Sequence, residues 1–241
     1  MKTIDLEYHV GAKRYLGYYA VDDAKAGKRP GVLVAHEGGG LSDITKAVAR
    51  RLAQAGYAAF ALDYFGDGQP LADINEAMAR LGPWMADPTG IREIATAALE
   101  VLKAQGEVDE SRLAATGYCF GGTTALELGR MGTELKAIVG FHSGLATARP
   151  AAAGAIKAKV LVCIGADDPI IPPDQRLAFE KEMNEAGADW RMNLYGDAGH
   201  SFTNPEVGRL SRPGFAYDAL ADRRSWVAML DLFDEAFGAA M

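Results

Sequence analysis

Residues 112–131, RLAATGYCFGGTTALELGRM, decide the fold of this chain. The apolar residues 112–117 predict a buried strand, and residues 120–131 predict a helix. The turn between them, GYCFGG, has the pattern G-x-S-x-G with Cys119 in the serine position. On such a sharp, strained turn, flanking glycines keep a β-carbon from blocking the neighbouring backbone. This context favours an exposed nucleophile over a structural cysteine that lies beside glycines by chance, and the following helix dipole favours its thiolate.

Apolar runs and helical patterns alternate on either side of this unit. The sequence predicts antiparallel strands first, then strands and helices in alternation, which is the pattern of a mainly parallel sheet with helices on both faces. We therefore expect a single α/β domain over residues 1–241, with a surface excursion around a possible helix at 65–90. The predicted strands are 2–9, 13–21, 30–37, 57–64, 112–117, 136–142, 158–165 and 189–195, and the predicted helices are 43–55, 90–105, 120–131, 173–187 and 216–238.

The overall composition excludes several classes of protein. A formal charge of −7 without any basic run argues against a nucleic-acid partner. No apolar stretch reaches the length of about 18 residues that a membrane helix needs, and MKTIDLEYHV lacks the layout of a signal peptide. Two cysteines, with Cys163 inside an apolar strand, do not suggest disulfides or a zinc site. We expect a cytoplasmic protein, a monomer or small homo-oligomer, whose partner is a small molecule.

A nucleophilic thiol needs a base, and the base needs a carboxylate to orient it. His200 follows the last predicted strand in a loop of small residues, DAGHSF, and is the best base among the four histidines. The segment GADDPIIPP follows the strand at 158–165, so either Asp167 or Asp168 could orient the imidazole. We prefer Asp168, and expect Asp167 to face solvent. The order nucleophile, acid, histidine is that of the α/β hydrolases.

A loop rich in glycine follows the strand at 30–37. His36-Glu37-Gly38-Gly39-Gly40 is typical of a loop that brings backbone N–H groups to a developing oxyanion. We predict that the N–H groups of Phe120 and Gly38 form this oxyanion hole. A flexible turn is the plainer alternative, and a phosphate cradle is disfavoured because G-x-G-x-x-G is absent.

GYCFGG, the AHE segment, GADDPIIPP and AGHSF together resemble the dienelactone hydrolase (carboxymethylenebutenolidase) family, over nearly the whole chain. The resemblance implies an α/β-hydrolase fold and a Cys119–His200–Asp168 triad that cleaves ester or lactone bonds through an acyl-enzyme, without a metal or organic cofactor. It also implies that Glu37 contacts the resting thiol until substrate frees the thiol to pair with His200. A nearby carboxylate disfavours the thiolate, so the nucleophile would be protected.

The same resemblance implies two arginines for a substrate carboxylate. Asn204 stands where one would lie, and Arg80 is a few residues out of register with the other. A neutral ester, lactone or thioester therefore fits the sequence at least as well as an anionic lactone. Trp84, Tyr118 and His142 are further candidates for the substrate pocket, although each could equally serve packing.

Two other functions use the same residues. A thiol-based redox or ligand-binding protein would need Cys119 but has no need of His200 and Asp168 in triad order. An acyltransferase or thioesterase would keep the triad and differ only in the acyl donor or acceptor.

Overall fold

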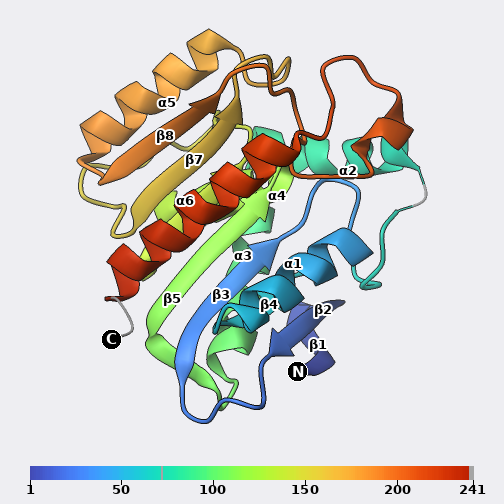
Figure 1. The fold of residues 1–241 in the computed structure, drawn as a ribbon, viewed down its shortest axis with the longest axis vertical. Helices are drawn as coiled ribbons and strands as arrows, with labels where there is room; N and C mark the ends of the chain where they lie inside the picture. The colour runs from blue at the N-terminus through green and yellow to red at the C-terminus, as the bar shows by residue number, and fades with distance from the viewer. Residues whose placement is uncertain (72, 239–241) are drawn as a thin grey trace.

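The structure is a computed structural model that describes residues 1–71 and 73–238. The described strands form one eight-stranded sheet in the order β1-β2-β4-β3-β5-β6-β7-β8 (Figure 1). β1 and β2 are antiparallel to each other, β2 is antiparallel to β4, and the remaining neighbours are parallel. The expectation of a mainly parallel sheet with antiparallel N-terminal strands is confirmed. The strands are β1 (Lys2–Val10), β2 (Lys13–Val21), β3 (Arg29–Ala35), β4 (Ala58–Ala61), β5 (Val108–Tyr118), β6 (Ala137–Phe141), β7 (Lys159–Gly165) and β8 (Trp190–Tyr195).

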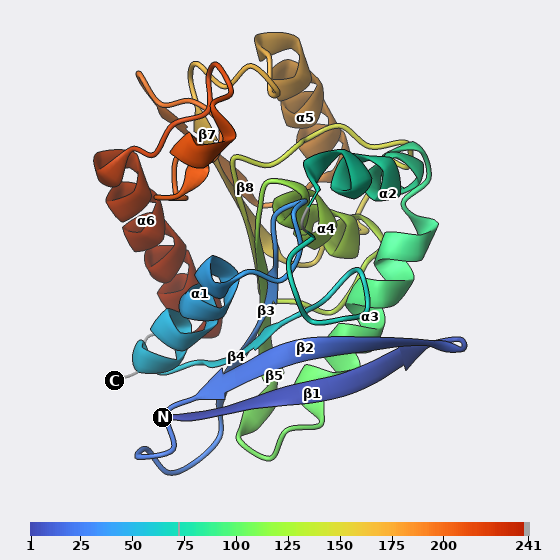
Figure 2. The same cartoon turned by 90° about the vertical axis from the view of Figure 1, so that its right-hand side faces the viewer.

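Helices cover both faces of the sheet, as Figure 2 shows. On one face, α1 and α6 bury Leu52 and Phe233 in one apolar cluster, and on the other, α3 and α5 bury Leu99 and Phe179 in a second. Strands buried on both faces explain why β3, β5 and β7 carry continuous apolar runs rather than an alternating pattern. The helices are α1 (Asp43–Gln54), α2 (Ile74–Ala86), α3 (Thr89–Lys103), α4 (Phe120–Arg130), α5 (Pro173–Ala186) and α6 (Ala219–Phe237), with a short 3-10 helix, η1, at Val207–Leu210.

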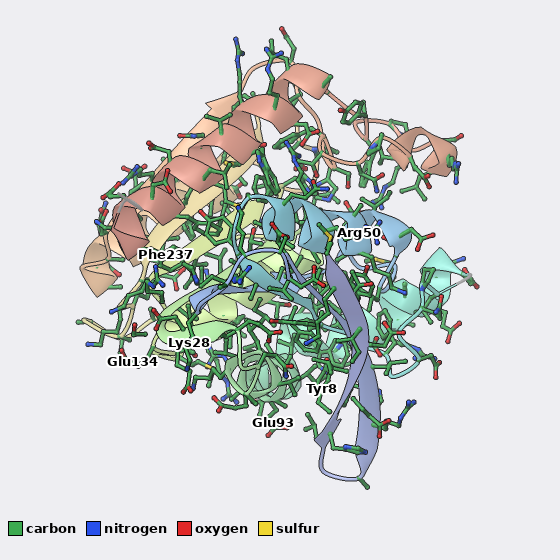
Figure 3. The ribbon with its side chains drawn as sticks, turned by 60° about the horizontal axis from the view of Figure 1, so that its bottom comes forward. Tyr8, Lys28, Arg50, Glu93, Glu134 and Phe237 are labelled. Carbon is green, nitrogen blue, oxygen red and sulfur yellow. The ribbon has the colours of Figure 1, made fainter. Side chains whose placement is uncertain are left out.

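The ribbon of β1 and β2 extends beyond the rest of the sheet (Figures 2 and 3). Tyr8 lies on its inward side, stacked on Tyr15 with ring centroids 5.2 Å apart, and its hydroxyl donates to the backbone oxygen of Asp63 at 2.5 Å. These buried contacts fasten the ribbon to the chain that leaves β4.

The strand predicted at 57–64 ends earlier, at Ala61. The reason is Asp63, whose buried carboxylate accepts the backbone N–H groups of Phe65, Gly66 and Gly68 at 2.8–3.0 Å. This local turn is incompatible with a continuing strand. It directs the chain into the predicted excursion, where α2 begins at the N-cap Asp73.

None of the helices within the described residues combines the length and the apolar character needed to cross a membrane.

Candidate active site

Cys119 lies on the predicted turn between β5 and α4, with φ at 53° and ψ at −118°. A non-glycine residue rarely has positive φ, and the conformation persists only where the surroundings enforce it. Close packing enforces it here, because a β-carbon on Gly121 would lie 2.0 Å from the backbone oxygen of Ala35. The backbone N–H of Cys119 donates to the oxygen of Phe141 at 2.9 Å. The turn thus leaves the thiol partly exposed while its backbone is wedged between β3 and β6.

The thiol meets His200, which the loop after β8 brings to the same edge of the sheet. The His200 Nε2 atom lies 3.2 Å from the Cys119 sulfur, and Nδ1 lies 2.7 Å from Oδ2 of Asp168. The other Asp168 oxygen accepts the backbone N–H of Ile170 at 2.8 Å, so the carboxylate is held on both sides. Asp167 is exposed. The structure therefore brings together Cys119, His200 and Asp168, and of the two neighbouring aspartates it selects Asp168.

The charge of His200 is set by these partners. Burial alone would lower the pKa of the imidazole, but the hydrogen bonds with Asp168 and Cys119 outweigh it and raise the pKa of His200 to about 10. A proton on His200 is therefore strongly stabilised beside the sulfur.

His142 lies directly behind the turn, with φ at 40° after β6. Its Nδ1 atom accepts the backbone N–H of Cys119 at 3.1 Å, and its Nε2 lies 2.8 Å from the Thr203 hydroxyl. Burial and the nearby His200 hold the pKa of His142 well below its usual value, so the ring is neutral. His142 thus supports the turn from behind, which is the structural role that the sequence left open beside a place in the substrate pocket.

Glu37 does not contact the thiol in this structure. Its Oε2 accepts from the side-chain amide of Asn204 at 2.8 Å, whereas the sulfur of Cys119 is paired with His200. The Asn204 amide is a stronger donor to this buried carboxyl than a thiol, and its bond opposes the rise in the pKa of Glu37 that burial causes. His36, also buried, lies with Nδ1 2.5 Å from the backbone oxygen of Glu37 and thereby orients this segment.

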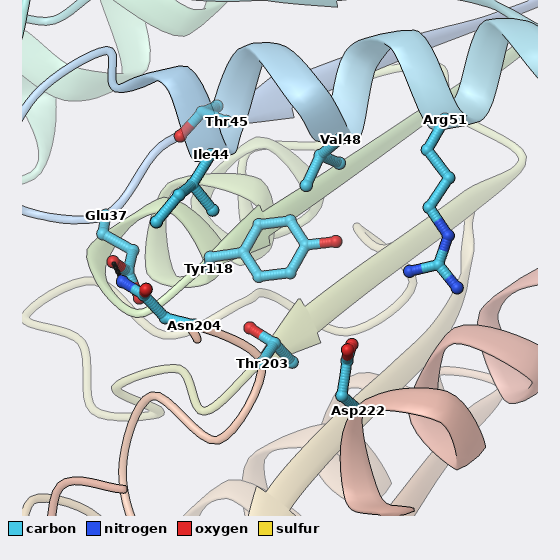
Figure 4. A pocket seen from close by; sticks show the side chains of 9 residues that line it. All are labelled: Glu37, Ile44, Thr45, Val48, Arg51, Tyr118, Thr203, Asn204 and Asp222. Atoms are coloured by element: carbon cyan, nitrogen blue, oxygen red, sulfur yellow. Dashed lines mark hydrogen bonds between the residues drawn. The ribbon is translucent and has the colours of Figure 1, made fainter. Parts of the chain in front are cut away.

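A small pocket of about 70 Å³ adjoins Glu37 and Asn204, between α1 and α6 (Figure 4). Tyr118 lies in its middle, and Arg51 and Asp222 face its far end (Figure 4). Tyr118 and Asn204 therefore belong to this small pocket, on a different side of the turn from Trp84.

A larger cavity of about 440 Å³ opens beside the first turn of α4. Trp84 and Phe120 stack on each other in its wall, with ring centroids 6.2 Å apart and an interplanar angle of 25°. The expectation that Trp84 lines the pocket agrees with this position. Arg80 does not line this cavity: its side chain is exposed, pairs with Glu76 at 2.5 Å, and lies with its guanidinium 5.4 Å from the centre of the Phe65 ring.

Of the two predicted oxyanion donors, Phe120 lines this cavity. Phe120 is the first residue of α4, so its backbone N–H has no acceptor within the helix. Gly38 follows β3, whose end packs against Gly121 in the turn. Their joint role stays a prediction.

Sequence reasoning missed Thr203, which carries no motif of its own. Its only signal is its position three residues after His200, in a loop that must return across the turn.

A mainly parallel sheet with Cys119 on the turn after β5, Asp168 after β7 and His200 after β8 is the arrangement of an α/β hydrolase. The sequence profile of the dienelactone hydrolase family matches residues 16–237, and the chain belongs to this family of hydrolases acting on lactone or ester bonds. A solved structure named m3DLH is 44% identical, with a TM-score of 0.93 over 98% of each chain.

Two further relatives are informative. A dienelactone hydrolase-like promiscuous phosphotriesterase, P91, from metagenomic libraries is also 44% identical, with a TM-score of 0.92 over 98% of each chain. A Salmonella typhimurium protein, provisionally named a carboxymethylenebutenolidase, is 30% identical over 227 residues, which are 90% of this chain and 81% of the relative.

Proposed function

We propose that the protein hydrolyses esters or lactones of small molecules through an acyl-enzyme on Cys119, with His200 as acid and base and Asp168 as its orienting carboxylate. One observation carries the proposal: the unbroken series of contacts from the Cys119 sulfur to His200 at 3.2 Å and on to Asp168 at 2.7 Å. This is the arrangement in which a thiol can lose its proton to a base held in one tautomer.

Acylation begins with transfer of the thiol proton to Nε2 of His200. The sulfur electron pair then forms a bond to the substrate carbonyl carbon, and the oxyanion lies against the N–H groups of Phe120 and Gly38. When the carbonyl re-forms, the carbon–oxygen bond to the leaving group breaks. His200 gives its proton to that oxygen, and a thioester remains on Cys119.

Deacylation uses the same groups in reverse. Once the sulfur is acylated, His200 loses the thiolate partner that helped to raise its pKa, so the neutral imidazole becomes available as a base. It takes a proton from water, whose oxygen attacks the thioester carbon. The carbon–sulfur bond breaks, the acid is released, and the thiol regains the proton.

The test is turnover of short-chain 4-nitrophenyl esters by the wild type and by Cys119→Ala, with intact-mass detection of the acyl adduct. We expect Cys119→Ala to fall to the background rate and to lose the adduct. Cys163→Ala is the matched control: the Cys163 side chain is fully buried in β7, its sulfur accepts from the Tyr195 hydroxyl at 3.7 Å, and its loss should keep activity.

Two results would contradict the proposal. Equal activity in Cys119→Ala would remove the thiol from the chemistry, and an inert wild type with reversible oxidation of Cys119 would favour the redox alternative. Faster consumption of ester on addition of an alcohol or thiol acceptor, with a new ester as product, would show acyl transfer instead of hydrolysis.

A second candidate activity is phosphotriester hydrolysis, favoured by the 44% identity to P91, which is described as a promiscuous phosphotriesterase. Diethyl 4-nitrophenyl phosphate tests it directly: release of 4-nitrophenol that depends on Cys119 supports it, and no release above background rejects it.

A further inference from the structure

The larger cavity is built around the residue that follows the nucleophile. Its lining includes Phe120 and Thr123 from the first turn of α4, Trp84 of α2 and Ile91 of α3. At about 440 Å³ it lies within the size range of small-molecule sites, which runs from roughly 300 to 1,000 Å³. A substrate group bound there would be adjacent to the thiol.

The one charged side chain among the described lining residues is paired with arginines outside the lining. Among the described lining residues the sole ionisable side chain is Glu127, which is buried. Its carboxylate accepts from Arg92 at 2.6 and 2.9 Å and from Arg130 at 2.9 Å. Arg130 also donates to Glu182 and to the backbone oxygen of Leu145. The two arginines and two glutamates of this network balance in charge, and neither arginine lines the cavity.

The remaining lining is apolar or neutral. The aromatic rings of Trp84 and Phe120 stack in the wall, and Tyr64 and Phe65 extend the same cluster, with Tyr64 at 5.5 Å from Phe120 and Phe65 at 6.3 Å from Trp84. A carboxylate entering this space would lose its hydration and meet no cation among the lining residues, which is strongly unfavourable. Arg80, which lies over the Phe65 ring at 5.4 Å, is outside the lining and is already paired with Glu76. An aryl or alkyl group would gain from leaving water.

We propose that this cavity binds an uncharged, apolar part of the substrate, an aryl ring or a medium-length alkyl chain, and that the enzyme selects against substrates carrying a carboxylate there. This proposal rests on the proposed ester or lactone hydrolysis at Cys119 and names the substrate class that the site accepts.

The test uses matched substrate pairs that differ in one charge. For the acyl side the pair is 4-nitrophenyl pentanoate and 4-nitrophenyl hemiglutarate, which share a leaving group. For the leaving-group side the pair is methyl 3-acetoxybenzoate and 3-acetoxybenzoate. We expect kcat/KM to favour the neutral member by about 100-fold in the pair whose variable group enters the cavity, equivalent to about 2.7 kcal/mol.

Ala148→Arg tests the same idea by adding a cation. Ala148 is an exposed residue at the cavity rim, so the substitution supplies a guanidinium without disturbing the core. We expect it to reduce the preference for the neutral ester about tenfold. Ala152→Arg is the matched control, because Ala152 is exposed on the same loop but does not line the cavity.

The outcomes separate the two proposals. Turnover that depends on Cys119 but shows no charge preference in either pair, or an equal response to Ala148→Arg and Ala152→Arg, overturns the cavity assignment and leaves the hydrolysis standing. Turnover that persists in Cys119→Ala, or no turnover of any ester, overturns both.

Discussion

Two buried histidines lie side by side at the active site, and they behave in opposite ways. The rings of His200, in the loop after β8, and His142, after β6, have centroids 5.3 Å apart. His200 has the pKa raised to about 10, whereas the pKa of His142 is held well below its usual value. Burial lowers both, so burial does not explain the difference.

The partners explain it. His200 has a carboxylate on one nitrogen and a thiol on the other, and both favour its protonated form. His142 accepts a backbone N–H on Nδ1, so that nitrogen cannot carry a proton, and its Nε2 is satisfied by the Thr203 hydroxyl. The contacts of each ring therefore decide its charge: they favour the protonated form of His200 and the neutral form of His142.

The largest effect on activity is expected from removing the Asp168 carboxylate, which contacts His200 but not His142. Asp168→Asn should leave the fold intact and lower kcat by about 10³- to 10⁴-fold, because the amide no longer holds His200 in the working tautomer. Steady-state rates on 4-nitrophenyl acetate measure the loss, and circular dichroism checks the fold. Asp167→Asn, at an exposed neighbour, is the control; a comparable loss there would remove Asp168 from its assigned role.

A smaller effect is expected from substitutions of His142. His142→Asn can still accept the N–H of Cys119 but loses Thr203, whereas His142→Gln can still reach Thr203 but loses Cys119. Asparagine also tolerates the positive φ at this position. We expect His142→Gln to lower kcat/KM about tenfold with little change in KM, since a displaced turn misplaces the thiol.

The double variant His142→Asn, Thr203→Val tests whether His142 acts through its hydrogen bond with Thr203. Both changes break the same hydrogen bond, so the double variant should be no slower than His142→Asn alone. Additive losses, or equal rates in the Asn and Gln variants, would mean that His142 only fills space.

The smallest effect concerns stability against pH. The unfolded chain protonates its histidines near pH 6.5. In the folded protein, burial lowers the pKa of His36 to about 4 and holds the pKa of His142 well below its usual value, so both rings stay neutral. Below pH 6.5 the unfolded state therefore binds more protons, and stability falls by up to about 1.4 kcal/mol per pH unit for each such histidine. His200 acts in the opposite sense, and its contribution is lost as pH rises from 6.5 through about 10.

Urea unfolding of the wild type and His142→Asn at pH 7.0 and 5.5 measures this term. We expect the variant to lose about 1 kcal/mol less than the wild type between the two pH values. An identical loss in both proteins would show that His142 is not neutral in the fold.

The sequence predicted those parts of the site that local motifs specify. The strained turn of Cys119 needs glycines within a few residues, and the positions of His200 and Asp168 after their strands follow from the order of elements in the chain. The sequence could not predict that His142 and His200 would differ in pKa. The partners that keep His142 neutral are a backbone amide 23 residues away and a hydroxyl 61 residues away.

The side chains that were misplaced depend on distant contacts in the same way. Glu37 turns to Asn204, which is 167 residues away in the chain, and no local pattern encodes that pairing. Arg80 was placed by its approximate position along the chain, but its guanidinium lies outside the cavity, over Phe65 and paired with Glu76. The shortened strand at 57–64 has a local cause instead, because Asp63 accepts the backbone N–H groups of Phe65, Gly66 and Gly68 and closes a turn there.

The crowding of the turn has an evolutionary consequence. No β-carbon fits at Gly121, so the backbone that carries Cys119 admits almost no variation, yet the sulfur itself is partly exposed and free of that crowding. A serine hydroxyl would occupy the same place without moving a backbone atom, and a single nucleotide change is enough to exchange the two residues. A lineage built on this scaffold can pass between thiol and hydroxyl chemistry while its architecture stays unchanged.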